Sequence, residues 1–129
     1  MARRVLHIPG KWHGDQPIPP ATKTGPLVTS GGVSGMNPET NETPEDVAEQ
    51  VKWAFEHVRR IMAEAGGNSD DIAHMTFYVK SRDARPLINT EWVAMFPDAE
   101  NRPTRHVIAY DGLPGNMQLQ IQFTGYVGS

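Results

Sequence analysis

The sequence predicts an α/β (α+β) domain in which two helices pack on one face of a mixed sheet. Two segments, 44–65 and 84–96, carry apolar residues at the three- and four-residue spacing of an amphipathic helix. Two others, 72–80 and 118–127, alternate apolar and polar residues, as strands with one buried face do. The 129 residues are enough for one such domain, and we expect it to span 1–129.

The N-terminal part is rich in proline and glycine, so residues 1–25 are expected to form an irregular segment. Each proline lacks a backbone donor and biases the residue before it away from helix. A short strand is expected over 26–30, and Gly31 and Gly32 end it. Residues 31–43 are expected to be a loop, with their glycines serving a turn of positive φ.

The helix expected over 44–65 has the strongest local signals in the chain. Thr43 is the predicted N-cap, and Pro44 suits the first helical position. The apolar stripe places His57 on the polar side of this helix, and the glycines at 66–67 supply its stop. The arginines at 59 and 60 follow Glu56 by three and four residues, which indicates a solvated face rather than a nucleic-acid surface.

Strands and helices alternate in the rest of the chain. A strand is expected over 72–80 with His74 on its non-core face, and a helix over 84–96. Strands over 104–110 and 118–127 follow, joined by the turn 111–115. Because both helices cover the same face of the sheet, the other face is left polar. In so short a chain we expect another subunit to cover it.

Composition excludes several classes of function. Lys+Arg is 12 and Asp+Glu is 15, so the formal charge is −3, which argues against nucleic-acid binding through phosphate neutralisation. The absence of cysteine excludes disulfides, thiol nucleophiles and cysteine-ligated metals. The five histidines lack a ligand spacing, so no metal site is expected. No apolar run reaches the ~18 residues of a membrane span, so we expect no membrane partner and a cytoplasmic location.

Two features of the last third of the chain point to a binding site. Arg105 begins an apolar strand, where an arginine is either a surface charge or a fork that grips a carboxylate through paired hydrogen bonds. Three amides, Gln118, Gln120 and Gln122, alternate with apolar residues and so share one face of the last strand. Neutral hydrogen-bonding groups in this arrangement are typical of a subunit interface and equally of a polar cleft.

Short motifs in a fixed order resemble the Rid/YjgF family of reactive-intermediate (enamine/imine) deaminases over about residues 26–127. The motifs are Val28-Thr-Ser-Gly31, Asn37-Pro-Glu-Thr40, Ala48-Glu-Gln50, Ala63-Glu-Ala-Gly66, Asp71-Ile72, Thr76-Phe-Tyr-Val-Lys80, Asn89 ahead of an aromatic residue, Arg102-Pro-Thr-Arg105 and Leu113-Pro114. The order and spacing of these motifs, rather than any one of them, carry the resemblance.

The resemblance implies a chorismate-mutase-like fold assembled as a homotrimer, with a cleft between each pair of protomers. It also implies hydrolysis of small carboxylate-bearing enamines or imines to a keto acid and ammonia, without cofactor or metal. By motif, Arg105 matches the arginine that binds the substrate carboxylate, and Asn89 matches an asparagine that lines the cleft. Ser30 and Gly31 match the loop near the substrate. Val107 takes a position that is often cysteine in the deaminases.

The sequence departs from the family pattern at two places. Gln120 occupies a position that is a glutamate in the deaminases. The resemblance implies that this glutamate orients or activates the attacking water. An amide can hold water, but it cannot accept a proton as a carboxylate does. The Gly-Pro-Tyr segment that supplies a cleft tyrosine is replaced by Asp-Gln-Pro-Ile-Pro-Pro at 15–20, with Trp12 and His13 as candidates to fill its space.

Two hypotheses of different class follow from the resemblance. In the first, the chain is an enzyme in which Arg105 anchors the substrate carboxylate and Gln120 positions water. In the second, it is a non-catalytic, regulatory trimer that binds a small carboxylate. This hypothesis follows because Gln120 replaces the glutamate that the deaminases use in catalysis. An endoribonuclease, a label also used for this family, is a minor alternative that the net charge disfavours.

Overall fold

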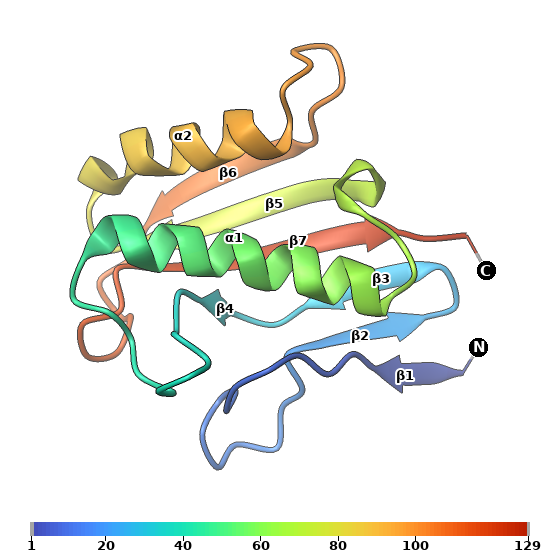
Figure 1. Ribbon diagram of the computed structural model, residues 1–129, viewed down its shortest axis with the longest axis horizontal. Coiled ribbons are helices and arrows are strands. Elements are labelled where there is room, and N and C mark those ends of the chain that lie inside the picture. The colour runs from blue at the N-terminus through green and yellow to red at the C-terminus, as the bar shows by residue number, and fades with distance from the viewer. Residues whose placement is uncertain (1, 129) are drawn as a thin grey trace.

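The computed structural model describes residues 2–128 and contains one sheet covered by two helices (Figure 1). The strands are β1 (Arg3–Val5), β2 (Ala21–Thr24), β3 (Leu27–Ser30), β4 (Val33–Ser34), β5 (Ile72–Val79), β6 (Thr104–Ala109) and β7 (Leu119–Tyr126). The helices are α1 (Val47–Glu64) and α2 (Arg85–Met95), with 3₁₀ turns η1 (Ser69–Asp71) and η2 (Arg82–Ala84). The predicted mixed sheet with two helices is confirmed.

The sheet order is β1-β2-β3-β7-β5-β6, and β4 pairs with β7 beyond the end of β3. The pairs are antiparallel except β5–β6, which is parallel. α2 connects this parallel pair and α1 connects β4 to β5, so both crossovers place their helices on the same face (Figure 1). β6 therefore forms one edge of the sheet, close to α2.

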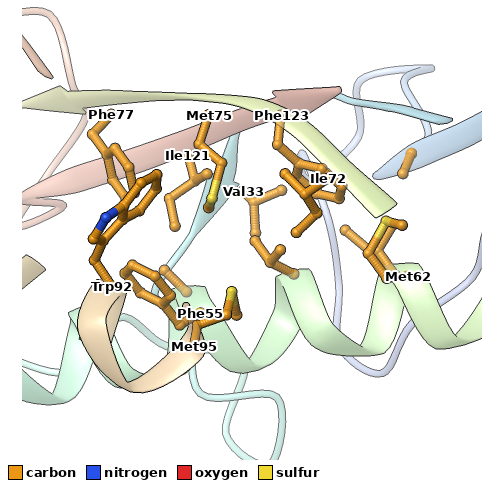
Figure 2. Close-up of a cluster of buried hydrophobic side chains, with 14 of the residues drawn as sticks. Val33, Phe55, Met62, Ile72, Met75, Phe77, Trp92, Met95, Ile121 and Phe123 are labelled. Atoms are coloured by element: carbon orange, nitrogen blue, oxygen red, sulfur yellow. The ribbon is translucent and has the colours of Figure 1, made fainter. Parts of the chain in front are cut away.

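The core lies between the helices and the face of the sheet that they cover (Figure 2). β5 and β7 send alternate side chains into it, all fully buried: Met75, Phe77, Val79, Leu119, Ile121 and Phe123. Phe77 stacks on Phe55 of α1 with 5.7 Å between ring centroids, and it meets Trp92 of α2 edge-on at 6.2 Å. Burying one large apolar side chain contributes about 1.5–3 kcal/mol, so this alternation accounts for much of the folding free energy.

α1 begins at Val47, later than predicted, and Asp46 rather than Thr43 is its N-cap. The Asp46 Oδ1 accepts a hydrogen bond from the backbone N–H of Ala48 at 3.3 Å. Both residues have side chains able to cap a helix. Asp46 is the cap because residues 43 and 44 are held in the loop that leads to the helix. The Asn116 side chain donates a hydrogen bond to the Thr43 carbonyl, and the Gln50 side chain donates one to the Pro44 carbonyl.

A fully buried glutamine, Gln50, ties the start of α1 to the segment that enters β7. Its Nε2 donates to the carbonyls of Pro44, at 2.7 Å, and Asn116, at 3.1 Å. Its Oε1 accepts from the backbone N–H of Gln118 at 2.9 Å. Beside it, a Cβ on Gly35 would overlap the Gln50 carbonyl, so this glycine allows the backbone to approach α1 and does not serve the positive φ that we expected.

The expectation that residues 1–25 are irregular is wrong at β1 and β2. β2 pairs with β3 over its whole length, and β1 adds to the outer edge of β2. Leu6 is fully buried and joins the core, which holds this segment in place. The prolines lie between the two strands, where a missing N–H costs no ladder hydrogen bond. The expected loop 31–43 likewise contains a strand, β4, which pairs with β7. Val33 of β4 is buried in the core.

His57 is fully buried, which corrects its predicted place on the polar side of α1. Its ring lies between two indoles, edge-on to Trp12 at 4.7 Å and stacked on Trp53 at 5.7 Å between centroids. Nε2 donates to the Met36 carbonyl at 2.7 Å. The helical periodicity alone gave the wrong answer because the N-terminal segment that carries Trp12 packs on this side of α1.

The burial of His57 makes the stability of the fold depend on pH. Burial lowers its pKa below the ordinary 6.5, the hydrogen bond to Met36 offsets part of this, and the charge of Arg60 adds to the lowering. The unfolded chain therefore binds a proton that the folded chain resists, and the free energy of unfolding should fall as the pH drops below about 6.5. Above that pH His57 is neutral in both the folded and the unfolded chain, so its burial no longer makes the free energy of unfolding depend on pH.

Urea denaturation at acidic and at neutral pH measures this effect. The His57→Gln variant keeps an amide donor for the Met36 carbonyl but does not titrate, so it should lose less stability on acidification than the native protein does. Equal losses in the two proteins would contradict the assignment to His57.

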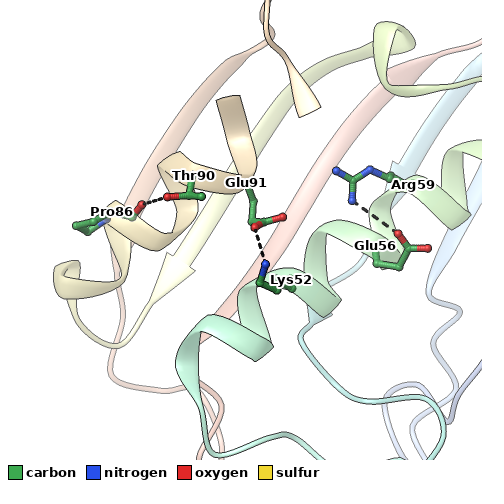
Figure 3. A network of polar contacts seen from close by, with 6 residues as sticks. All are labelled: Lys52, Glu56, Arg59, Pro86, Thr90 and Glu91. Atoms are coloured by element: carbon green, nitrogen blue, oxygen red, sulfur yellow. Dashed lines mark hydrogen bonds and ion pairs between the residues drawn. The ribbon is translucent and has the colours of Figure 1, made fainter. Parts of the chain in front are cut away.

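Ion pairs lie on the outer side of the helices (Figure 3). Lys52 of α1 pairs with Glu91 of α2 at 3.6 Å, and Glu56 pairs with Arg59 at 3.7 Å and Arg60 at 3.2 Å. The two arginines thus lie on a solvated face and are matched by an acid, as the sequence predicts. Within residues 2–128, neither helix has the length and apolar character that crossing a bilayer requires.

Candidate functional site

Arg105 extends from the edge strand β6 toward the helix-covered face of the sheet. In the parallel register it pairs with Met75, whose side chain is buried beneath the helices. Its Nη2 donates to the Asn89 Oδ1 at 2.5 Å, and its guanidinium carbon lies 4.9 Å from the ring centre of Trp92. β6 and α2 therefore fix this cation from two sides and place Asn89 directly beside it.

Among residues 2–128, no carboxylate lies within ion-pair distance of Arg105. Burial, and then the positive charge of Arg85, lowers the pKa of the Arg105 guanidinium, which still remains a cation at neutral pH. A partly desolvated cation is stabilised when an anion pairs with it. The N–H groups that Asn89 does not use form the planar fork that fits a carboxylate.

Val107 follows Arg105 on the same face of β6, in register with Phe77. It is partly buried and packs against the core. Its side chain has no polar atom, so it supplies an apolar neighbour to the cation and no chemistry of its own.

Ser30 shapes the loop between β3 and β4. β7 pairs with β4 near its start and with β3 near its end, and the residues between β3 and β4 leave part of the β7 backbone without a ladder partner on that side. The Ser30 Oγ accepts a hydrogen bond from the Phe123 N–H at 2.9 Å and donates to the Gly31 carbonyl at 2.9 Å. The Ser30 hydroxyl proton is thus used in the hydrogen bond to the Gly31 carbonyl, and the Ser30 Oγ can accept one further hydrogen bond.

Gln120 lines a hollow of about 360 Å³ at the end of the sheet where β4 pairs with β7. The lining also includes Trp12, His13, Gly32, Met36 and Met117. The Gln120 Nε2 donates to the Met117 Sδ at 3.4 Å, and its Oε1 lies so close to Gly32 that a Cβ there would overlap it. Glycine at position 32 therefore makes room for this side chain.

Trp12 and His13, the candidates to fill the space of the missing tyrosine, both reach this hollow. The backbone of His13 is left-handed, with φ of 60°. Its ring packs on Gly31, where a Cβ would lie 3.3 Å from the His13 Nε2. Two consecutive glycines thus accommodate two side chains, His13 on the first and Gln120 on the second.

The predicted site residues form two groups within one chain. Arg105, Asn89 and Val107 gather at the β6 edge, whereas Ser30, Gly31 and Gln120 surround the break between β3 and β4. Arg105 is in register with Met75, which faces the helices, and Gln120 with Tyr78, which faces away from them. Their strands are also separated by β5. A single copy of the chain therefore does not bring Arg105 and Gln120 into one site.

Several residues of the hollow, including Lys11, Met36 and Met117, could not be predicted from the sequence. They come from three separate segments, and nothing in their local pattern links them to Gln120. Within the described part of the chain, no group of three or more His, Asp or Glu side chains is arranged to hold a metal ion.

Comparison with known proteins places this chain in a family. The family model described as endoribonuclease L-PSP matches residues 16–127. The chain belongs to this family. Among relatives in the endoribonuclease L-PSP family, the 2-iminobutanoate/2-iminopropanoate deaminase of Escherichia coli strain K12 is 30% identical over 97 residues, which are 74% of this chain and 75% of that protein.

Solved structures of this family share the fold. A Rid-family protein of unknown function from Yersinia pestis superposes with a TM-score of 0.87 at 18% identity, covering 98% of this chain and all of that one. TdcF of E. coli with bound serine superposes with a TM-score of 0.83 at 25% identity, covering 95% of this chain and 98% of that one. The predicted membership of the Rid/YjgF family is confirmed.

Proposed function

We propose that this chain hydrolyses small carboxylate-bearing enamines or imines to a keto acid and ammonia, in clefts between the protomers of a homotrimer. Arg105 of one protomer anchors the carboxylate, and Gln120 of a neighbour positions the water. The E. coli relative named as an iminobutanoate/iminopropanoate deaminase supports the reaction class. Serine, the molecule bound in the TdcF structure, carries a carboxylate and supports the ligand class.

The observation that carries this proposal is the guanidinium of Arg105, which has an amide and an aromatic ring as neighbours but no acid among the residues that the structure describes. Asn89 fixes its direction and Trp92 covers it. A surface arginine that served only solubility would need neither partner. A cation that is oriented and left without a counter-ion is the arrangement that a carboxylate-binding site requires.

The opposite directions of Arg105 and Gln120 support a site made by more than one copy. On β5, β6 and β7 the side chains that face away from the helices include no Asp, Glu, Lys or Arg: they are His74, Thr76, Tyr78, Thr104, His106, Ile108, Gln120, Gln122, Thr124 and Tyr126. Ile108 and Tyr126 are exposed large apolar residues in this set. An uncharged sheet face with exposed apolar groups suits burial against another subunit.

In the proposed reaction the protonated C=N carbon of the substrate is the electrophile. Water held by the Gln120 amide attacks this carbon, the C=N π electrons move to nitrogen, and the proton lost by the attacking water passes through solvent to that nitrogen. Collapse of the carbinolamine forms the C=O bond and breaks the C–N bond, and the hydroxyl proton leaves with ammonia as ammonium. Because an amide accepts no proton, Gln120 contributes by positioning, which can still accelerate a reaction strongly.

A second candidate function, a non-catalytic trimer that binds a small carboxylate, is favoured by the contacts of Gln120. Its Nε2 donates to Met117, and its amide cannot accept the proton that a carboxylate at this position would take. The endoribonuclease alternative has less support, because the net charge is −3 and Arg59 and Arg60 are both paired with Glu56.

Replacing Gln120 by glutamate separates the enzyme from the binder. Pure protein is added to a system that generates 2-aminoacrylate, and ammonia release is followed. We expect the native protein to exceed buffer, and Gln120→Glu to exceed the native protein by roughly 10²-fold or more, since a positioned general base contributes about 10²–10⁴-fold. The matched control is Gln118→Glu, the same change at an amide outside the uncharged sheet face described above, whose one side-chain hydrogen bond is solvent-accessible, and its rate should equal the native rate.

Activity that appears only in Gln120→Glu would assign the natural chain to the binding function. If neither protein accelerates ammonia release with any of several imines, the hydrolase proposal is wrong.

A further inference from the structure

The hollow beside Gln120 is larger than the smallest imines of the proposed reaction require. Its volume is about 360 Å³. At about 30 Å³ per non-hydrogen atom, the share of one molecule in liquid water, it has room for about a dozen such atoms. The imine of a three-carbon acid would fill about half of that space. A ligand whose carboxylate lies at Arg105 therefore has space for a bulky side chain on the Gln120 side.

One wall of the hollow is a fixed aromatic surface, Trp12. The Trp12 Nε1 donates to the Pro9 carbonyl at 3.1 Å. Its ring meets the buried His57 at 4.7 Å, and His57 is in turn stacked on Trp53. An indole held in this way presents its surface without losing further conformational freedom when a ligand binds, which favours affinity.

Part of the remaining lining suits an uncharged, apolar group, while the rest of the wall is made polar by His13, Ser34, Asn41 and Thr43. Met36 and Met117 also line the hollow, and methionine side chains adapt to ligands of different shape. In the described chain no carboxylate lines it, and Lys11 is the charged residue in its wall. A cationic side chain would find no counter-ion there and would be repelled by Lys11, whereas an aliphatic or aromatic side chain would contact Trp12 and the methionines.

We propose that this hollow is the side-chain subsite of the enzyme and that Trp12 directs its specificity toward imines of 2-keto acids with branched or aromatic side chains. This inference rests on the proposed function, which places the reacting carbon next to Gln120. Trp12 acts by contact with the part of the substrate that does not react, so it determines specificity and is not a catalytic residue.

Binding of pyruvate and phenylpyruvate, measured by isothermal titration calorimetry, tests the subsite without turnover. The native protein should bind phenylpyruvate about 10–100-fold more tightly, the effect of burying an aryl group. In Trp12→Ala the two acids should bind with nearly equal affinity, while Trp12→Phe should keep most of the preference. Trp53→Ala is the matched control, because it removes an indole from the other side of His57 without changing the lining of the hollow.

The outcomes distinguish this subsite from the carboxylate site. If both acids bind equally to the native protein, or if Trp12→Ala keeps the preference, the subsite is overturned while Arg105-dependent binding still supports the proposed function. Tighter binding of 2-oxoglutarate than of phenylpyruvate would also overturn it, because Lys11 would then select a second carboxylate. If neither keto acid binds, the proposed function fails and the subsite fails with it.

Discussion

Replacing Arg105 by alanine is expected to weaken the binding of 2-ketobutyrate by about 10²-fold or more, and to reduce turnover of the corresponding imine at least as much. The guanidinium is oriented by Asn89 and has no acid partner among the described residues, so its fork is available to the ligand carboxylate. Each hydrogen bond to a charged group contributes about 1.5–3 kcal/mol, and a bidentate pair makes two. Calorimetric titration of native and variant protein measures the loss.

Two variants separate this role from general electrostatics. Arg105→Lys keeps the charge but loses the planar fork, so its affinity should lie between those of the native protein and Arg105→Ala. Arg85→Ala removes a cation close enough to lower the pKa of Arg105, yet it should leave binding nearly unchanged because Arg85 is not the anchor. Undiminished binding by Arg105→Ala, in a protein whose melting temperature is unchanged, would refute the anchor.

Mixing of inactive variants shows whether the site is shared between copies. Arg105→Ala and Gln120→Ala protomers, unfolded together and refolded, should regain part of the native turnover, because some clefts then combine an intact Arg105 with an intact Gln120. A site built within one copy would give no recovery, since every copy in the mixture lacks one of the two residues.

Replacing Gln50 by leucine is expected to lower the free energy of unfolding by about 2–6 kcal/mol. The side chain is fully buried and makes three hydrogen bonds, to Pro44, Asn116 and Gln118, that link the start of α1 to the entry of β7. Leucine is close in size but takes the hydrogen-bond partner from the Pro44 carbonyl and the Gln118 N–H, at roughly 1–3 kcal/mol each, whereas the Asn116 carbonyl keeps a hydrogen bond from the Gln118 side chain. Since whole domains are stable by only about 5–15 kcal/mol, much of the native stability should be lost.

Urea denaturation of Gln50→Leu and Gln118→Leu provides the measurement and its control. The Gln118 side chain makes one solvent-accessible hydrogen bond, to the Asn116 carbonyl at 3.3 Å, so its loss should cost well under half as much. If the two variants unfold at the same urea concentration, Gln50 is not the link that its contacts indicate.

Much of the fold was predictable because its signals are local. The alternation in β5 and β7 and the apolar stripe of α1 follow directly from the geometry of strands and helices, so these elements appear close to where the sequence places them. The order of short motifs was enough to identify the family. Arg105 was also recognisable, because a lone cation at the start of an apolar strand is unusual.

The departures all depend on contacts between segments that are distant in sequence. His57 is buried because the N-terminal segment carries Trp12 onto α1, and helical periodicity contains no information about that segment. Asp46 replaces Thr43 as the N-cap because hydrogen bonds from Asn116 and Gln50 hold residues 43–44 outside the helix.

The sequence by itself determined α1, α2, β3, β5, β6 and β7, the sheet with two helices and the family, since each depends on spacing along the chain. Only the tertiary structure decided that Arg105 and Gln120 leave opposite faces of the sheet, because strand register and order set those directions. It alone also created the hollow beside Gln120, whose walls come from loops with no shared pattern. Side-chain periodicity identifies a buried face, but the residues that meet across a site are fixed by packing between segments.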